Sequence, residues 1–415
     1  MKRFLLALAF LGLIGSASPA FAACGDGASA CFWIGGGANA NWNTTGNWSN
    51  TSGGASSGTT PATGDSICFD SANSGASTIN ASRSILSINT AGTCTGGSAS
   101  AYTGTITHSA AVTLTVTGND AGANGGTTFL ISSSSGWTAS NATTSAVAFS
   151  ATSGTITFTP NSSGASRNFG NVTFGSTGSS TGTFTLGSTV ISAATSVLTL
   201  TAGTFDNNSL NLTYGSFSSS NSNTRALSNA TGTWSLISSA GATILDLTTT
   251  TNFTSISTAF SGLTISVSGA VAGARGIIAG SAMTIGTLNV GANSSGGLLT
   301  LSAPSSATLT ITNFTATSPA AIRVAGSSSR AYTFTNSVTL TGTANNPIAF
   351  MGDGGGSAFP VITGSFSGDY VTIGQFTFGA GTQSFTNCFN YANVTSSGTF
   401  SCAPPAAGGG RIIGG

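Results

Sequence analysis

The side chains that could carry acid–base chemistry in this 415-residue chain are few. All eight acidic residues are aspartates, and the candidates close in sequence are Asp65 with Asp70 and Asp353 with Asp369. A glycosidase needs two carboxylates that face one cleft. A polysaccharide lyase on a β-helix would also need a cation, and Arg323 and Arg330 lie nearest before Asp353. Nothing in the spacing brings these groups together, so a polysaccharide-cleaving enzyme is kept as an alternative only.

The other signatures of catalysis are missing from the sequence. It contains no phosphate-binding loop and no nucleophile elbow. His108 is the only histidine, so neither a His-based triad nor a zinc site can be completed from the residue types present. We therefore expect a non-enzymatic protein with no catalytic residue, no cofactor and no metal.

Threonine recurs at alternate positions, which is a strand pattern because successive side chains of a strand point to opposite faces. Such positions could align into a flat array of hydroxyl and methyl groups that suits ice or a crystalline polysaccharide. They could equally be the solvated face of ordinary strands, where threonine is favoured. The irregular spacing between them favours the second interpretation. The positions are Thr105/Thr107, Thr113/Thr115/Thr117, Thr155/Thr157/Thr159, Thr183/Thr185, Thr199/Thr201, Thr308/Thr310/Thr312, Thr333/Thr335 and Thr339/Thr341.

Three of the five tryptophans, Trp33, Trp42 and Trp48, crowd near the start of the chain. Their rings could stack on sugars and form a glycan-binding face. They could instead pack on one another and bury the end of a coil, which their crowding favours.

Six cysteines lie at the two ends of the chain, and none lies between Cys94 and Cys388. An even number behind a secretion signal indicates disulfides. Six cysteines allow fifteen connectivities, and the clustering favours Cys24–Cys31, Cys68–Cys94 and Cys388–Cys402. No pair has metal-ligand spacing. We expect these bridges to pin the first and last coils of an elongated fold.

The first residues read as a secretory signal peptide over 1–22. Lys2 and Arg3 precede an apolar segment, and cleavage is predicted between Ala22 and Ala23. The apolar segment is too short to span a membrane. A lipoprotein leader, with Cys24 acylated, is the rival interpretation. We therefore predict export through the inner membrane to the cell surface or exterior, or otherwise to the periplasm.

The composition restricts the fold. Charged residues make up 4% of the chain, against roughly 25% in ordinary soluble domains. Glutamate is absent and Lys2 is the only lysine, so the residues that usually cover helices are lacking. Mean hydropathy is +0.29 and 25 phenylalanines lie in alternating patterns, which argues against disorder. The net charge is near zero with no basic patch, so nucleic acid is not an expected partner.

Short alternating runs end at Gly or Asn, and a Gly-small-aromatic unit recurs. The repeated units are Gly182-Thr183-Phe184, Gly203-Thr204-Phe205, Gly215-Ser216-Phe217 and Gly232-Thr233-Trp234. Short strands separated by corners predict a solenoid whose coils pair with one another. We predict an all-β fold: a single elongated right-handed parallel β-helix, the hand following the usual preference of parallel connections. Coils of ~20 residues would give about fifteen turns and a rod of roughly 70–80 Å.

The predicted organisation is a Trp/Cys-rich cap with the first coils over 23–95, the β-helix over 96–403 and a flexible Pro/Gly tail over 404–415. The cap segment reads Trp33-Ile34-Gly35-Gly36, Asn41-Trp42, Gly46-Asn47-Trp48-Ser49, Pro61, Gly64-Asp65 and Phe69-Asp70. This order resembles the opening of secreted bacterial and phage-encoded β-rich proteins, including passenger proteins with autotransporter-associated β-strand repeats.

The resemblance covers roughly residues 32 to 236 and implies a parallel β-helix on a surface or appendage, without assigned chemistry. The chain departs from the passenger pattern because it ends without a C-terminal barrel of alternating strands. The main prediction is a secreted structural or adhesive protein of a cell surface, extracellular matrix or virion-like appendage. A glycan- or ice-binding module is the second hypothesis. The expected partners are a second copy of the chain or a surface polysaccharide.

Overall fold

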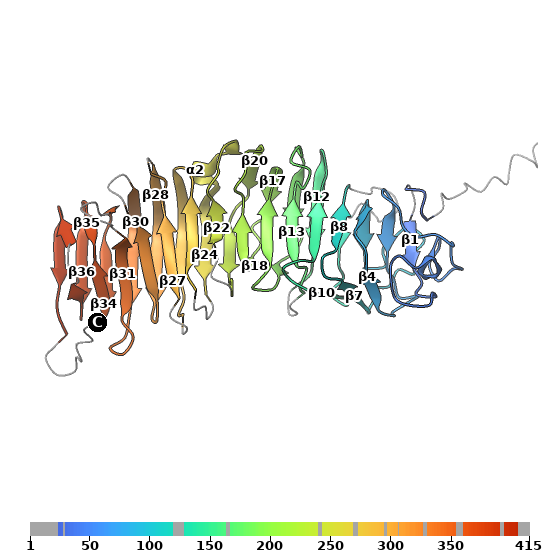
Figure 1. Cartoon of the computed structure of the whole chain (residues 1–415), viewed down its shortest axis with the longest axis horizontal. Coiled ribbons are helices and arrows are strands. Elements are labelled where there is room, and N and C mark those ends of the chain that lie inside the picture. Colours follow the sequence, from blue (N-terminus) through green and yellow to red (C-terminus); the bar gives the residue numbers. More distant parts are fainter. Residues whose placement is uncertain are drawn as a thin grey trace, which may run out of the picture.

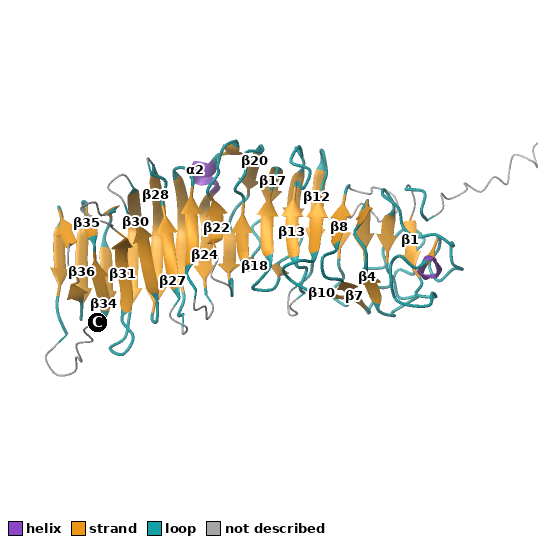
Figure 2. Ribbon diagram, viewed as in Figure 1, coloured by secondary structure: helices purple, strands orange, loops and turns teal. Residues whose placement is uncertain are grey.

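The chain forms an elongated stack of β-strands along one long axis (Figure 1). This is a computed structural model, and it describes residues 24–27, 30–118, 128–162, 167–239, 243–268, 273–293, 297–305, 307–326, 330–353, 360–390 and 394–405. The described part is all-β, with one short 3-10 helix (η1, Thr45–Asn47) and one short α-helix (α2, Ile256–Ala259) (Figure 2). The predicted leader, with Ala22 and Ala23, lies outside the described residues.

Four sheets contain the strands, and all of their pairings are parallel except that of β1 with β2. Sheet 1 has the order β2(Trp48–Ser49), β1(Ala30–Trp33), β3(Ser66–Cys68), β6(Ser87–Asn89), β9(Phe129–Leu130), β12(Thr155–Thr159), β14(Thr183–Leu186), β17(Gly203–Asp206), β20(Arg225–Ser228) and β23(Phe253–Thr254). Sheet 2 has the order β5(Arg83–Ile85), β8(Thr113–Val116), β11(Ala146–Phe149), β13(Asn171–Phe174), β16(Val197–Leu200), β19(Ser216–Ser218), β22(Thr243–Leu247), β25(Arg275–Ala279), β27(Leu298–Ser302), β29(Ala321–Ala325), β31(Ile348–Asp353), β34(Val371–Gly374) and β37(Phe389–Asn390).

Sheet 3 has the order β15(Val190–Ile191), β18(Leu212–Tyr214), β21(Gly232–Leu236), β24(Phe260–Val267), β26(Met283–Val290), β28(Thr308–Thr317), β30(Ala331–Thr341), β32(Val361–Thr363), β35(Phe376–Phe378) and β38(Val394–Ser396), with a branch from β30 through β33(Phe366–Asp369) and β36(Thr382–Thr386) to β39(Thr399–Cys402). Sheet 4 is small and contains β4(Ser77–Ile79), β7(Thr105–His108) and β10(Gly136–Ala139).

The strands visit the sheets in a cyclic order along the chain. β17 lies in sheet 1, β18 in sheet 3 and β19 in sheet 2, and β20, β21 and β22 repeat the cycle. This connectivity, with long parallel sheets, is consistent with a β-solenoid. Sheet 2 holds thirteen strands between residues 83 and 389, so one cycle averages roughly 25 residues, longer than the ~20 expected from the repeat. The twelve spacings between these thirteen strands correspond to about 58 Å, somewhat less than the predicted rod.

The corner between sheets 1 and 3 disappears in the second half of the molecule. Sheet 1 ends at β23, and α2 follows it. Three single strands of eight to eleven residues, β26, β28 and β30, then cover both positions, and the pairing of β28 with β30 shifts register where a corner would stand. A β-bulge bends a strand and increases its twist, so one long strand can turn between two faces.

The core is a column of side chains that alternate with the outward residues of every strand. Buried aromatic rings contact one another from coil to coil; Phe174, for example, stacks on Phe184 and Phe205 at centroid distances of 5.3 and 4.9 Å. Gly203 begins one of the repeated units with φ of +80°, and a Cβ there would lie 2.5 Å from the Gly182 oxygen. The glycine of this unit is therefore required by the corner, and the aromatic residue fills the core.

The first coil is closed by an aromatic cap. Trp33, Trp42 and Trp48 are buried and pack on one another and on Phe69, with ring centroids 5.2 to 6.2 Å apart. The Trp48 Nε1 donates to the Trp42 oxygen at 2.8 Å. Their faces are covered, so these rings cannot stack on a sugar, and they pack the end of the core.

Three disulfides tie the two ends. The bridges are Cys24–Cys31, Cys68–Cys94 and Cys388–Cys402, the pairs that the clustering favours, and no cysteine of the described residues is free. Because the Cys24 sulfur is bonded to Cys31, it is not available to carry an acyl chain.

Arginine side chains hold neighbouring segments together by donating to backbone oxygens. Arg225 is buried and lies over the Phe253 ring at 5.2 Å. Most of the other described arginines also bind carbonyls: Arg83 that of Pro61, Arg167 those of Pro160 and Ser133, Arg275 that of Ser268 and Arg330 that of Ala303. Arg323 differs, since it forms the only ion pair of the described residues, with Asp353. The few cations are thus mostly structural.

Candidate functional site

The outer surface of sheet 3, which we call the hydroxyl face, carries small polar side chains in register across neighbouring strands. Its longest row, row 1, runs without interruption through nine strands. Row 1 is Thr213, Ser235, Ser266, Asn289, Thr315, Thr339, Ser367, Ser384 and Ser401. In β21, β24, β26, β28 and β30 the row member lies between two buried residues, so the period of two that builds the core also builds the row.

Shorter rows run beside row 1. Row 2 is Thr233, Thr264, Thr287, Asn313 and Ser337; row 3 is Thr284, Thr310, Thr333 and Thr363; row 4 is Thr317, Thr341, Asp369 and Thr386. Neighbouring strands lie about 4.8 Å apart and alternate residues of one strand about 6.7 Å apart, so the polar groups form a two-dimensional lattice. Row 1 spans eight strand spacings, roughly 38 Å.

Hydrogen bonds between side chains hold parts of this lattice. The Thr315 hydroxyl donates to the Asn289 amide oxygen at 2.7 Å, and the Thr363 hydroxyl donates to that of Thr333 at 3.2 Å. Asp369 is the only charged residue in the strands of sheet 3. It accepts from the Thr386 hydroxyl at 2.9 Å and from the Asn387 amide at 2.7 Å. The face is therefore polar and nearly uncharged, and side-chain hydrogen bonds link some of its neighbouring strands.

The outer surface of sheet 2 is a natural comparison. Its corresponding row starts as Ser84, Thr115, Ala148, Thr173, Thr199, Ser218, Asp246, Ile278 and Ser302. One charged side chain, Asp246, and two apolar side chains, Ala148 and Ile278, interrupt it. In the next row Arg323 and Met351 are opposite one another. Among the described residues, sheet 2 therefore has no row of small hydroxyl and amide groups as long as row 1 of sheet 3.

The structure divides the Thr-x-Thr positions among different faces. Thr155 and Thr157 lie on sheet 1, Thr113 and Thr115 on sheet 2, and Thr308 and Thr310 on sheet 3. They do not make one array. The row that does form includes serine and asparagine members that the threonine pattern overlooked. Small polar residues at alternate positions, counted regardless of type, would have indicated them.

The aspartates that the structure describes do not gather at one cleft. Asp65 accepts backbone N–H groups of Gly25, Gly27 and Ala62 at 2.8 to 2.9 Å. Asp70 accepts those of Ala72 and Ser98 at 2.9 and 3.0 Å. Asp353 is half exposed and pairs with Arg323 at 3.4 Å, a surface contact worth little. Asp65 and Asp70 thus act as local acceptors of backbone N–H groups at turns.

One group of three possible metal ligands occurs in the described residues, where Cys24, Cys31 and Asp65 come within 4.8 Å of one another. The two sulfurs are bonded to each other, so they offer no thiolate. The carboxylate already holds the glycine loop beside the disulfide. We interpret the group as a structural contact that holds the N-terminal cap together.

His108, the single histidine, is buried beside Trp137, with ring centroids 6.0 Å apart. Neither ring nitrogen has a well-formed hydrogen bond. Burial lowers the pKa of His108 from its ordinary 6.5 to about 4, and the nearby Val112 backbone opposes the shift only weakly. The imidazole is therefore neutral in the folded protein and has no catalytic partner among the described residues.

We predict an acid-dependent loss of stability through His108. The unfolded chain binds a proton below about pH 6.5 and the folded chain only below about 4, so the free energy of unfolding falls as the pH drops through this window. The loss is about 3 kcal/mol. Denaturant unfolding at several pH values would measure it. A His108→Leu variant should lack this component, and an identical pH profile of both proteins would contradict the assignment.

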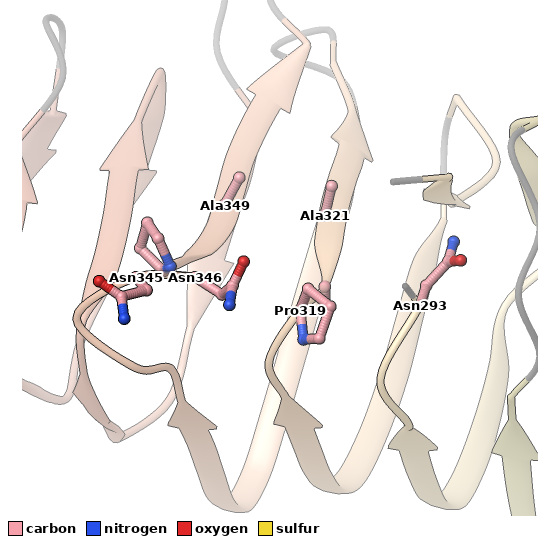
Figure 3. Close-up of a pocket in the computed structure, with 8 residues that line it drawn as sticks. Asn293, Pro319, Ala321, Asn345, Asn346 and Ala349 are labelled. Atoms are coloured by element: carbon pink, nitrogen blue, oxygen red, sulfur yellow. The ribbon is translucent and has the colours of Figure 1, made fainter. Parts of the chain in front are cut away.

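A depression of about 230 Å³ lies at the corners that lead from sheet 3 to sheet 2. Its lining includes Asn293, Pro319, Asn345 and Asn346, which come from successive corners (Figure 3). The Asn293 backbone N–H donates to the Pro319 oxygen at 2.6 Å and so links two of these corners. All lining residues are asparagine, proline or alanine, so the depression offers no acid, base or cation.

Comparison of the chain with models of protein families, with curated proteins and with solved structures finds no match. Within the described residues, no helix has the length and apolar character needed to cross a membrane. The features that describe this protein are its long parallel β-sheets, the disulfides at its two ends and the extended hydroxyl face of sheet 3.

Proposed function

We propose that this chain is an exported, non-enzymatic structural or adhesive protein, and that its hydroxyl face binds an extended, uncharged polymer such as a surface polysaccharide. The observation that carries the proposal is row 1, nine small polar residues in register on a sheet whose strands contain a single charge. A polymer with repeated hydroxyl groups can form hydrogen bonds with successive members of such a row. A polyanion would find no cation there.

The other features agree with a passive role. Catalysis depends on titratable groups tuned in a cleft. Here Asp65 and Asp70 accept backbone N–H groups at turns, Asp353 pairs with Arg323 at the surface, and most described arginines bind carbonyls. The leader predicted over 1–22 and the three disulfides support export to an oxidising compartment. The cyclic order of the sheets supports one continuous β-helix, right-handed by the usual preference, as the resemblance to autotransporter-associated β-strand-repeat passengers implies.

The test is binding of the purified protein to insoluble uncharged polysaccharides, measured as depletion from solution. Lysines placed on rows 1 and 2, as Thr287→Lys with Thr315→Lys, should weaken binding tenfold or more, because each long cation breaks the flat lattice. Tenfold corresponds to about 1.4 kcal/mol. The matched control is Thr173→Lys with Thr199→Lys, at equivalent outward positions of sheet 2.

The control pair should bind as the unmodified protein does. Equal losses in both variants, or binding that neither changes, would contradict the assignment to the hydroxyl face. The second candidate, ice binding, is favoured by the same two-dimensional spacing, and thermal hysteresis of the purified protein decides it. Release of reducing or unsaturated ends from a polysaccharide would overturn the non-enzymatic assignment.

A further inference from the structure

Three successive corners between sheet 3 and sheet 2 differ in length. Residues 318–320 alone join β28 to β29, whereas the connections on either side, 291–297 and 342–347, are seven and six residues long. The depression of about 230 Å³ lies at this short corner, between its longer neighbours (Figure 3). We call it the corner slot; residues 293, 319–321, 345–347 and 349 line it. Because neighbouring coils are about 4.8 Å apart, the connections on its two sides are separated by roughly 10 Å, which admits one ring-sized group.

Part of the corner slot is apolar. Ala321 and Ala349 are partners in the pairing of β29 with β31, and both are half-buried and point outward. Pro319 and Pro347 precede them by two residues each and also line the slot. Methyl and pyrrolidine groups from two successive coils thus offer a small surface against which the C–H face of a ring can pack.

The longer corner 342–347 adds polar groups to this surface. Asn345 and Asn346 are exposed, and neither side-chain amide forms a hydrogen bond with another described residue. Their turn is held in place, since Thr343 and Asn346 exchange two backbone hydrogen bonds at 3.1 Å and the Ser318 hydroxyl donates to the Asn346 oxygen. Figure 3 shows the Asn346 amide on the side of Pro319. An amide both donates and accepts, so it can pair with a hydroxyl group of a ligand.

The lining of the corner slot selects an uncharged ligand. None of its lining residues is ionisable. Arg323, the next outward residue of β29 after Ala321, is engaged with Asp353 at 3.4 Å. A charged ligand would lose water in the slot without gaining a partner. A neutral sugar ring fits this chemistry, because its hydroxyl groups match the amides and its C–H face matches the alanines and prolines.

The corner slot adjoins the hydroxyl face. Thr317 and Thr341, both of row 4, directly precede the two corners, and the Ser318 N–H donates to the Thr341 oxygen at 2.9 Å. Beyond the slot, the outward residues of β29 are Ala321, Arg323 and Ala325, so the lattice of small polar groups stops there. A polymer that lies along β28 and crosses rows 2, 1 and 4 therefore reaches the slot with its end.

We propose that the corner slot binds one neutral sugar ring, the terminal unit of a chain or branch of the polymer on the hydroxyl face. The inference rests on the proposed function and adds that the bound polymer runs parallel to the strands of sheet 3. A single neutral ring held by few hydrogen bonds is expected to bind alone in the millimolar range.

The test compares Ala349→Leu, which fills part of the slot, with Thr372→Leu. Both positions are half-buried outward sites and partners in the pairing of β31 with β34, but only Ala349 lines the slot. Each purified protein is titrated with glucose, galactose, mannose and N-acetylglucosamine, and binding is followed by nuclear magnetic resonance of the sugar. The unmodified protein and Thr372→Leu should bind at least one sugar in the millimolar range, and Ala349→Leu should bind it tenfold or more weakly. Asn346→Ala, which keeps the apolar surface, should weaken it threefold or more.

The polysaccharide depletion assay separates the slot from the face. Ala349→Leu should bind the polysaccharide threefold or more weakly than Thr372→Leu, and both should melt as the unmodified protein does. Equal binding by the two leucine variants, with binding lost in the Thr287→Lys, Thr315→Lys pair, would overturn the slot and leave the face standing. Failure of all four sugars to bind the unmodified protein would also overturn the slot. Normal polysaccharide binding by the lysine pair, with binding lost in Ala349→Leu, would overturn the face and support the slot.

Discussion

Replacing Phe314 by alanine is expected to lower the free energy of unfolding by about 3–5 kcal/mol, the usual cost of truncating a fully buried aromatic residue. Phe314 is buried at the middle of β28, with Phe334 and Phe350 at 5.6 and 6.2 Å. Its removal leaves a cavity in a column where each coil contacts only its neighbours, so the strands on both sides lose a packing partner. Denaturant unfolding monitored by circular dichroism measures the loss.

The adjacent residue supplies the control. Thr315 points outward and is a member of row 1. Thr315→Val keeps the side-chain shape and removes the hydroxyl that donates to Asn289, so stability should change by no more than about 0.5 kcal/mol. Similar losses in Phe314→Ala and Thr315→Val would contradict the separation of core and face by alternate residues.

The all-β character and the positions of corners could be predicted from the sequence because they are local properties. The unit around Gly203 shows why: glycine permits the positive φ, and the alternation after it places Phe205 inside. The length of the cycle was underestimated. Corners of variable length and the long strands β26, β28 and β30 increase the number of residues per cycle. No local sequence pattern predicts either feature.

The candidate site could be predicted only in part, because register between strands is not a local property. Residues 289 and 315 lie far apart in sequence, and one residue of slip in either strand would turn the side chains to opposite faces. The irregular spacing of Thr-x-Thr positions argued against a lattice when they were read along the chain. The number of residues between successive strands varies, but loops of different lengths still bring the paired strands into the same register. The packing of the three tryptophans was easier to predict from the sequence. Three large rings within sixteen residues are most simply buried by contact with one another.

Replacing Arg225 by leucine is expected to destabilise the protein by an amount on the order of 4 kcal/mol, because several buried carbonyls lose their donors together. The guanidinium donates to oxygens of Ser219, Asn223, Thr249 and Thr251. Thr249 and Thr251 follow β22, whereas Ser219 precedes Arg225, so one side chain joins two successive corners. Leucine keeps contact with Phe253 but satisfies none of these oxygens.

Arg323→Leu is the matched control, since Arg323 is 41% exposed and pairs with Asp353 at the surface. Its removal should cost less than about 1 kcal/mol. Thermal and denaturant unfolding of both variants therefore separates internal from surface arginines, and equal losses would contradict the distinction. The expected difference between the two stability losses also suggests a reason why a chain with so few charged residues contains buried arginines. Where corners turn carbonyls inward with no strand to pair them, a guanidinium supplies five donors from a single residue.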